Sequence, residues 1–169
     1  MFARRILLSA IAACGLANVY AQGIDQLPAA ERHVRAIELL RNGEHDVATA
    51  MLRDLYEGEP DTTTYLYDYV VALAWSQQDV VALSLEPELD PELAPLYVID
   101  AIAKSARNAR AYEVAIKWYL RAIELEPDEL DYRIGLALTH AEAGQYQEAD
   151  SVFAALPREQ RATTTVVAA

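Results

Sequence analysis

Apolar and small side chains recur at helical spacing over residues 111–127, which read AYEVAIKWYLRAIELEP. Ala115, Tyr119 and Ala122 should share one face of a helix, because residues three or four positions apart lie on the same side. The two alanines would let a neighbouring helix approach closely, the tyrosine ring would fill the gap between them, and Pro127 would end the helix. The pattern predicts the second helix of a helix–turn–helix unit.

The same small residue recurs once per unit along the chain, at intervals of 34, 33 and 34 residues, at Ala48, Ala82, Ala115 and Ala149. A period of about 34 residues is typical of tetratricopeptide repeats, in which each unit is a hairpin of two helices. In this register Gly43 and Gly144 fall at turns that need a left-handed backbone. On this pattern, which covers residues 29–163, the chain is identified as a member of the tetratricopeptide family.

The repeat implies an all-α fold, a right-handed α-solenoid of about four helical hairpins. A signal peptide at 1–21 and a polar lead at 22–28 should precede units at 29–62, 63–95, 96–129 and 130–163, with a tail at 164–169. The last residues, ATTTVVAA, have no charge and no helical amphipathicity, and no polar terminal helix covers the last unit. We therefore expect the chain to continue in the natural protein.

The second unit departs from the pattern in both of its helices. The first, TTTYLYDYVVALAW, is rich in β-branched and aromatic residues that favour strands. Leu66, Val70 and Leu73 nevertheless keep the helical period, so we predict a helix with Asp61 as its N-cap. The partner helix around Ala82 should be cut short by three prolines, at Pro87, Pro91 and Pro95.

The turn of the third unit has Arg110 where the first and fourth units have glycine. A left-handed backbone there would cost a non-glycine residue roughly 0.5 to 1 kcal/mol. We therefore expect this turn to take another form.

The N-terminus has the basic, apolar and small-residue segments of a secretory signal, in MFARR, ILLSAIAACGLANV and residues 19–21. The apolar run is too short for a spanning helix. We favour cleavage after Ala21. The alternative is lipidation at Cys14, because residues 11–14 also fit the small-residue pattern that precedes a lipidated cysteine. In both cases the mature chain crosses a membrane and has no pair of cysteines for a disulfide.

The chain is strongly acidic, with a net charge of −12. Removal of residues 1–21 would make it more negative, because they include Arg4 and Arg5 but no acid. Nucleic acid is excluded as a partner, because binding phosphates requires clustered cations and the only lysines are Lys104 and Lys117. A cationic polymer or a basic protein patch fits this charge better.

No residue pattern indicates a nucleophile triad, a metal site or a phosphate loop. His33, His45 and His140 lie far apart in sequence and are expected to pack or lie at the surface. Most acids fall at hairpin junctions such as EGEPD, EPELDPE and EPDELD, where they suit solvated helix ends. We therefore expect no enzyme, no cofactor and no metal.

A solenoid of this kind offers a concave face lined by the first helix of each unit. The side chains expected there mix rings with charges, namely His33, Arg41, Thr64, Tyr67, Trp75, Tyr97, Asp100, Lys104, Asn108, Asp131 and Glu142. Rings stack on hexoses and carboxylates pair with ammonium groups, so this face is a candidate sugar-binding track. The alternative is that the rings only complete the packing between hairpins. Chaperone-tail recognition is disfavoured, because the clamp positions hold Ile37, Val71 and Leu138.

The leader and three further stretches, ELLRNGEHDVATAML, ALAWSQQD and LEPDELDYRIGLALTHAEAGQYQEA, carry a more specific resemblance. In order and spacing they resemble the periplasmic N-terminal part of outer-membrane exporters of poly-β-1,6-N-acetylglucosamine, a biofilm polysaccharide. The resemblance is most specific at residues 131–133 and 144–146. In that family the repeats precede a β-barrel pore and receive the partly deacetylated polymer and its deacetylase.

The resemblance implies a periplasmic, outer-membrane-associated scaffold for a cationic or partly deacetylated polysaccharide, an envelope protein partner, or both. Its full-length form would be attached to an outer-membrane barrel, whose alternating strands these 169 residues do not show. The competing hypothesis is a generic envelope interaction module, in one form a lipoprotein adaptor. The mature N-terminus, Gln22 or a lipidated Cys14, distinguishes the two.

We expect Ala115→Trp to overpack the third hairpin and to lower the free energy of unfolding by about 1 to 3 kcal/mol. Denaturation experiments measure this loss, and a comparable change at a loop acid should have little effect. An unchanged melting temperature for Ala115→Trp would contradict the helix register.

Overall fold

The computed structural model describes residues 27–156, and within this part of the chain every regular element is helical. The predicted signal peptide, the alternative lipidation site Cys14, most of the polar lead, and the stretch from residue 157 to the tail lie outside the described residues.

The helices form four consecutive pairs, followed along the chain as α2 (Ala29–Arg41) and α3 (His45–Gly58), α4 (Thr63–Trp75) and α5 (Asp79–Ser84), α6 (Leu96–Asn108) and α7 (Tyr112–Leu125), and α8 (Leu130–Glu142) and α9 (Tyr146–Ala154). A short 3-10 helix, η1 (Glu86–Glu88), follows α5. The first helix of each pair begins at the first residue of an expected unit.

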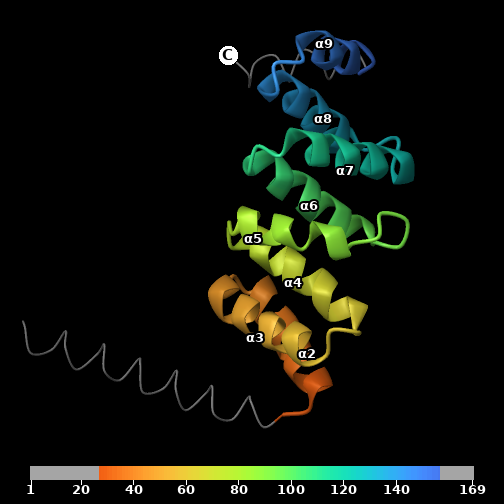
Figure 1. Cartoon of the computed structure of the whole chain (residues 1–169). Helices are drawn as coiled ribbons and strands as arrows, with labels where there is room; N and C mark the ends of the chain where they lie inside the picture. Colours follow the sequence, from red (N-terminus) through yellow and green to blue (C-terminus); the bar gives the residue numbers. More distant parts are fainter. Residues whose placement is uncertain (1–26, 157–169) are drawn as a thin grey trace, which may run out of the picture.

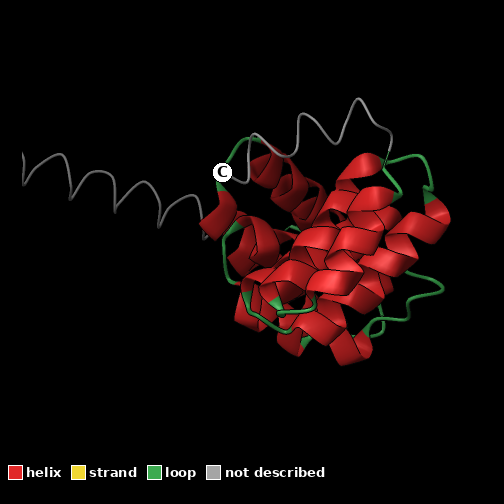
Figure 2. Cartoon of the chain, turned by 90° about the horizontal axis from the view of Figure 1, so that it is seen from above, coloured by secondary structure: helices red, strands yellow, loops and turns green. Residues whose placement is uncertain are grey.

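The pairs stack into an α-solenoid. Each α-helix contacts the next one along the chain, and the first helices of neighbouring pairs also contact one another, from α2 to α4, α6 and α8. Figure 1 shows this stack running from α2 and α3 at one end to α9 at the other. The view from above shows only helices and loops in the described part (Figure 2). The predicted solenoid is confirmed.

The recurring alanines lie in the interior of the stack. Ala48, Ala82 and Ala115 are fully buried, and Ala149 is nearly so. Tyr119 is also buried, as the close approach of neighbouring helices requires.

The turns within all four pairs share one backbone geometry. The turn residues Gly43, Gln77, Arg110 and Gly144 have φ values of 85°, 58°, 60° and 77°. At each turn, the next residue donates its N–H to a carbonyl five positions earlier, as Ala111 does to Ala106 at 2.8 Å. This is the hydrogen bond of a Schellman motif, which satisfies the end of the first helix. The expectation of another turn form at Arg110 was wrong, because this bond holds the backbone left-handed despite the side chain.

The second unit is helical, as predicted. α4 buries residues on most of its circumference, including Tyr65, Tyr69 and Val70, because it is covered by α3, α5 and α6. That environment explains its β-like composition. The predicted N-cap was one residue off, since Thr62 holds the N-cap position and makes no side-chain capping bond.

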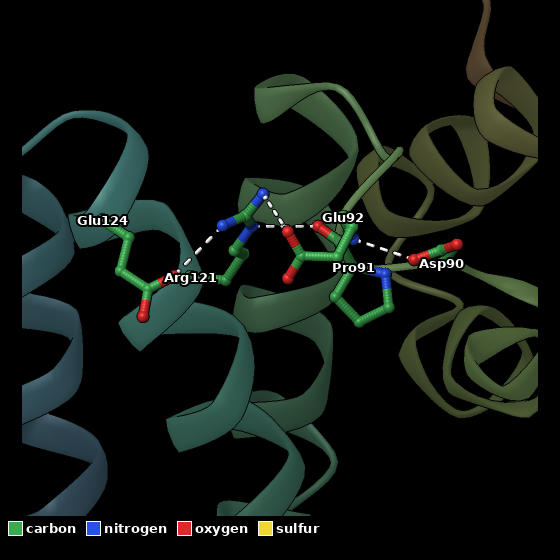
Figure 3. Close-up of polar contacts among 5 residues, drawn as sticks. All are labelled: Asp90, Pro91, Glu92, Arg121 and Glu124. Carbon is green, nitrogen blue, oxygen red and sulfur yellow. Dashed lines mark hydrogen bonds and ion pairs between the residues drawn. The ribbon is translucent and has the colours of Figure 1, made fainter.

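The proline-rich segment after α5 replaces the missing turns of that helix. α5 has only 6 residues, and η1 has a proline in its first turn. The segment is fastened to α7 by Arg121, whose Nε donates to the carbonyl of Pro91 at 3.0 Å and whose other nitrogens pair with Glu92 and Glu124 (Figure 3). These contacts hold the proline-rich segment against α7.

A second attachment joins the same segment to α7 through Glu86. Its Oε1 accepts hydrogen bonds from Lys117 Nζ at 2.7 Å and Trp118 Nε1 at 2.9 Å. Burial raises the pKa of Glu86, but the two donors outweigh that effect and hold the pKa below its usual value. The ionised carboxylate therefore stabilises the fold above pH 4.5, and this contribution is lost as the pH falls below that value.

The junction between the third and fourth pairs depends on a glycine. Gly135 lies on α8 against the ring of Tyr119 from α7, and a Cβ at this position would overlap ring carbons Cε1 and Cζ. Tyr119 is itself only 1% exposed, so the ring has little room to move away. A hydrogen at Gly135 is therefore what lets α7 and α8 pack at this distance.

We expect Gly135→Ala to lower the free energy of unfolding by about 1 to 3 kcal/mol, because the added methyl group overpacks the junction. Chemical denaturation measures the loss. Gly58→Ala is the matched control, since a Cβ there meets nothing within 4 Å and alanine favours the helix. Equal stability of the two variants would contradict the close packing of Tyr119 on α8.

Candidate functional site

A groove of about 520 Å³ runs across α2, α4 and α6. Its lining residues are Ile37, Arg41, Asp68, Val71, Trp75, Tyr97 and Asp100. Ile37 and Val71 pack against the hydrophobic core, whereas Trp75 is 51% and Tyr97 48% exposed. The groove thus combines an apolar base with accessible rings and charged groups.

Asp68 joins the three helices that form the groove. Its Oδ2 lies 2.6 Å from Nε2 of His33 on α2, and its Oδ1 accepts a hydrogen bond from the Tyr97 hydroxyl on α6 at 3.1 Å. Burial raises the pKa of Tyr97, and the charge of Asp68 raises it further, so the phenol stays protonated and continues to donate. The Asp68 side chain is only 13% exposed, so its bond to His33 is partly shielded from water, whereas the bond to Tyr97 lies at the exposed side of the groove.

Trp75 stands at the end of α4, at the edge of the groove. Its ring lies 6.0 Å from the His45 ring, centroid to centroid, and the same tryptophan also borders a neighbouring hollow of about 470 Å³ at the α2–α3 turn. The histidine ring limits the positions open to the indole, so an exposed aromatic surface is held toward both spaces.

Asp100 brings a carboxylate to the groove. Its Oδ2 accepts a hydrogen bond from Lys104 Nζ at 2.8 Å. Its Oδ1 is buried and has no hydrogen-bond partner among the described residues. A buried acceptor without a donor costs free energy. Because Oδ1 is covered, a ligand in the groove meets the exposed remainder of the Asp100 side chain.

The structure brings some of the predicted site residues together and separates others. Arg41, Trp75, Tyr97 and Asp100 line the groove, Lys104 pairs with Asp100, and His33 reaches it through Asp68. Five residues do not line it, namely Thr64, Tyr67, Asn108, Asp131 and Glu142. Tyr67 packs against the core, while Asn108 and Glu142 line a separate hollow at the α6–α7 turn.

Three groove residues were not predicted as lining, namely Ile37, Asp68 and Val71. The sequence contains a signal for each. Ile37 and Val71 occupy the clamp positions of related repeats, and Asp68 precedes Trp75 by seven residues, which places both on one face of α4.

Residues 27–156 contain neither a candidate membrane span nor a candidate metal cluster. No helix in this part of the chain has the length and apolar character needed to cross a bilayer. No group of three or more histidine, cysteine or acidic side chains in the same range is placed to hold a metal ion.

Solved structures share the arrangement of the helices. MamA from Desulfovibrio magneticus RS-1 superimposes with a TM-score of 0.67 at 18% identity, over 77% of this chain and 74% of that chain. MamA AMB-1 gives 0.70 at 18% identity, over 77% of each chain. The fold is a tetratricopeptide-like α-solenoid. At this identity the likeness of the solenoid to these structures shows the fold alone.

The chain also has curated relatives, although no protein-family model matches it. It is 28% identical over 82 residues to the poly-β-1,6-N-acetyl-D-glucosamine export protein of Escherichia coli K12, and equally so to that of Escherichia coli O157:H7. The match covers 48% of this chain but only 10% of each export protein. The predicted resemblance is confirmed as a similarity to part of these proteins.

We expect Asp68→Asn to lower the free energy of unfolding by about 1 to 2 kcal/mol, because His33 and Tyr97 lose a charged acceptor. Chemical denaturation measures this loss, and NMR of labelled tyrosine should show a lower pKa for Tyr97. Asp150→Asn removes the same charge from an exposed position on α9 and serves as the control. A Tyr97 pKa that does not move would contradict the bond between α4 and α6.

Proposed function

We propose that the solenoid is a non-catalytic, periplasmic binding domain of a polysaccharide export system. It guides partly deacetylated, cationic poly-N-acetylglucosamine or docks the enzyme that deacetylates it. The observation that carries the proposal is the groove, which is lined both by the exposed ring of Trp75 and by the carboxylate of Asp100.

The chemistry of the groove suits an aminosugar. A hexose ring would stack on the indole of Trp75, and a glucosamine ammonium group would pair with the exposed part of the Asp100 carboxylate. The apolar base of Ile37 and Val71 would contact the sugar's carbon atoms. Arg41 at the same groove could donate to sugar hydroxyl or acetyl oxygens, so both kinds of residue in a partly deacetylated polymer find a partner.

Charge outside the groove supports the same ligand. A chain with a net charge of −12 attracts a polycation over a distance of several ångströms and raises its local concentration. The similarity to part of the Escherichia coli export proteins supports a place in an exporter, where a membrane pore would belong to the rest of the protein. The same acidic surface would also accept a basic patch on the deacetylase.

Tryptophan fluorescence tests the proposal directly. The chain has two tryptophans, and Trp118 is fully buried, so a change on titration reports on Trp75. We expect a fully deacetylated β-1,6-linked hexamer to change the emission saturably at low salt. Binding should weaken at high salt, because ion pairing at an exposed site is screened. The fully acetylated hexamer should bind at least several-fold more weakly.

Two variants distinguish binding in the groove from general electrostatic attraction of a cationic polymer to the acidic chain. Asp100→Asn should weaken binding of the deacetylated hexamer by about 5- to 10-fold, the equivalent of about 1 kcal/mol. Glu148→Gln removes the same charge from an exposed position on α9, and should leave affinity within about twofold. Equal affinity for the two hexamers, or equal losses in the two variants, would count against the groove as the glycan site.

A further inference from the structure

The hollow at the α6–α7 turn differs in charge from the rest of the molecule. It measures about 450 Å³ and is lined by Arg107, Asn108, Arg110, Tyr112 and Glu142. We name it the arginine pocket. Two guanidinium groups and one carboxylate make it locally cationic, on a chain whose net charge is −12. Its ligand should therefore differ in sign from the ligand of the groove.

Arg110 holds a backbone conformation that its side chain does not favour. Its φ is 60°, at the turn position where the first and fourth pairs have glycine. Glycine would adopt the same turn without the steric cost of a Cβ. No hydrogen bond or ion pair within residues 27–156 uses the Arg110 side chain. All four turns share this left-handed backbone, and at the third turn the position is held by an arginine that lines a hollow.

The other donors of the arginine pocket are also incompletely used. Arg107 Nε lies 3.9 Å from Glu142 Oε1, which is too long for a hydrogen bond. α7 begins at Tyr112 with no side-chain cap, so the first N–H groups of a 14-residue helix lie beside the arginines. Asn108 adds an amide group. These groups come from α6, the turn, and α7, and they meet at one place.

We propose that the arginine pocket binds a carboxylate group of a partner protein. A guanidinium offers parallel N–H donors that match the two oxygens of a planar carboxylate. A single negative charge fits better than a phosphate dianion, because Glu142 already offsets part of the positive charge. A carboxylate carried by a protein also suits a shallow site at a hairpin edge, where neighbouring residues of the partner can add contacts.

This site is independent of the proposed glycan groove. The groove is formed by α2, α4 and α6, whereas the arginine pocket lies at the α6–α7 turn and the end of α8. A cationic polymer and an acidic protein segment could therefore occupy the solenoid together. A negative result in the hexamer titration would therefore not contradict the proposal for the arginine pocket.

An NMR titration of the isotope-labelled full chain tests the proposal. The probe is the dipeptide acetyl-Glu-Glu-amide, and the signals followed are the Nε–H groups of Arg107 and Arg110 and the backbone amide of Tyr112. We expect saturable shifts confined to these groups. The uncharged acetyl-Gln-Gln-amide should cause none, and acetate should bind at least several-fold more weakly than the acidic dipeptide.

Arg110→Gly separates binding from folding. Glycine removes the guanidinium but suits the left-handed turn, so the melting temperature should rise while affinity for the acidic dipeptide falls at least fivefold. Gln77→Gly relieves the same strain at the α4–α5 turn, where φ is 58°, and should raise the melting temperature without changing that affinity. Undiminished binding by Arg110→Gly, or equal binding of the Gln dipeptide, would overturn the proposal. Equal affinity for acetate would overturn the assignment to a protein carboxylate.

Discussion

Close approach of neighbouring helices at small residues is the constraint on which the structure depends. Tyr119 shows it most directly, because its buried ring lies against Gly135 of the next pair with no room for a methyl group. The buried alanines, one in each pair, allow the same close approach of neighbouring helices along the stack. Helices packed at such distances can shift little without overlap, so the position of each pair determines that of the next.

The groove is a consequence of that spacing. Asp68 can bond His33 and Tyr97 together only because α2, α4 and α6 lie side by side. The side chain is shielded and both oxygens are used, so the carboxylate links the helices instead of competing for ligand. Asp100, in contrast, bonds only Lys104 of its own helix among the described residues, and Trp75 is exposed. The groups that hold the helices together and the groups proposed to bind the glycan are therefore different residues.

The departures from a regular repeat fall into two kinds. In the second pair, prolines shorten α5, and Arg121 and Glu86 fasten the resulting segment to α7, so the irregularity is compensated by polar contacts. At the third turn, the hydrogen bond from Ala111 N–H to the Ala106 carbonyl accounts for the left-handed backbone of Arg110, but no hydrogen bond or ion pair among the described residues uses its side chain. A compensated irregularity is adequately explained by the fold. The fold explains the backbone at the third turn but not the arginine side chain there, which is why the arginine pocket stands apart.

The sequence by itself determined the helices, the repeat and the helical character of the second unit. These follow from the spacing of apolar residues within short segments, so Leu66, Val70 and Leu73 were enough to outweigh a β-like composition. It also placed Trp75, Tyr97 and Asp100 on one face of the stack, because the repeat assigns equivalent positions to different units. The left-handed turn at Arg110 was missed, since single-residue preference counted for more in the prediction than the hydrogen bond that closes the turn.

Only the tertiary structure decided which of these side chains meet. The partners of Asp68 lie 35 and 29 residues away in the sequence, and no local pattern specifies their distance or their hydrogen bonds. For the same reason Glu142, expected on the groove face, lies beside Arg107, 35 residues earlier in the sequence, in a separate hollow. Periodicity determines the side of a helix on which a residue lies. The packing of whole helices determines which residue it faces.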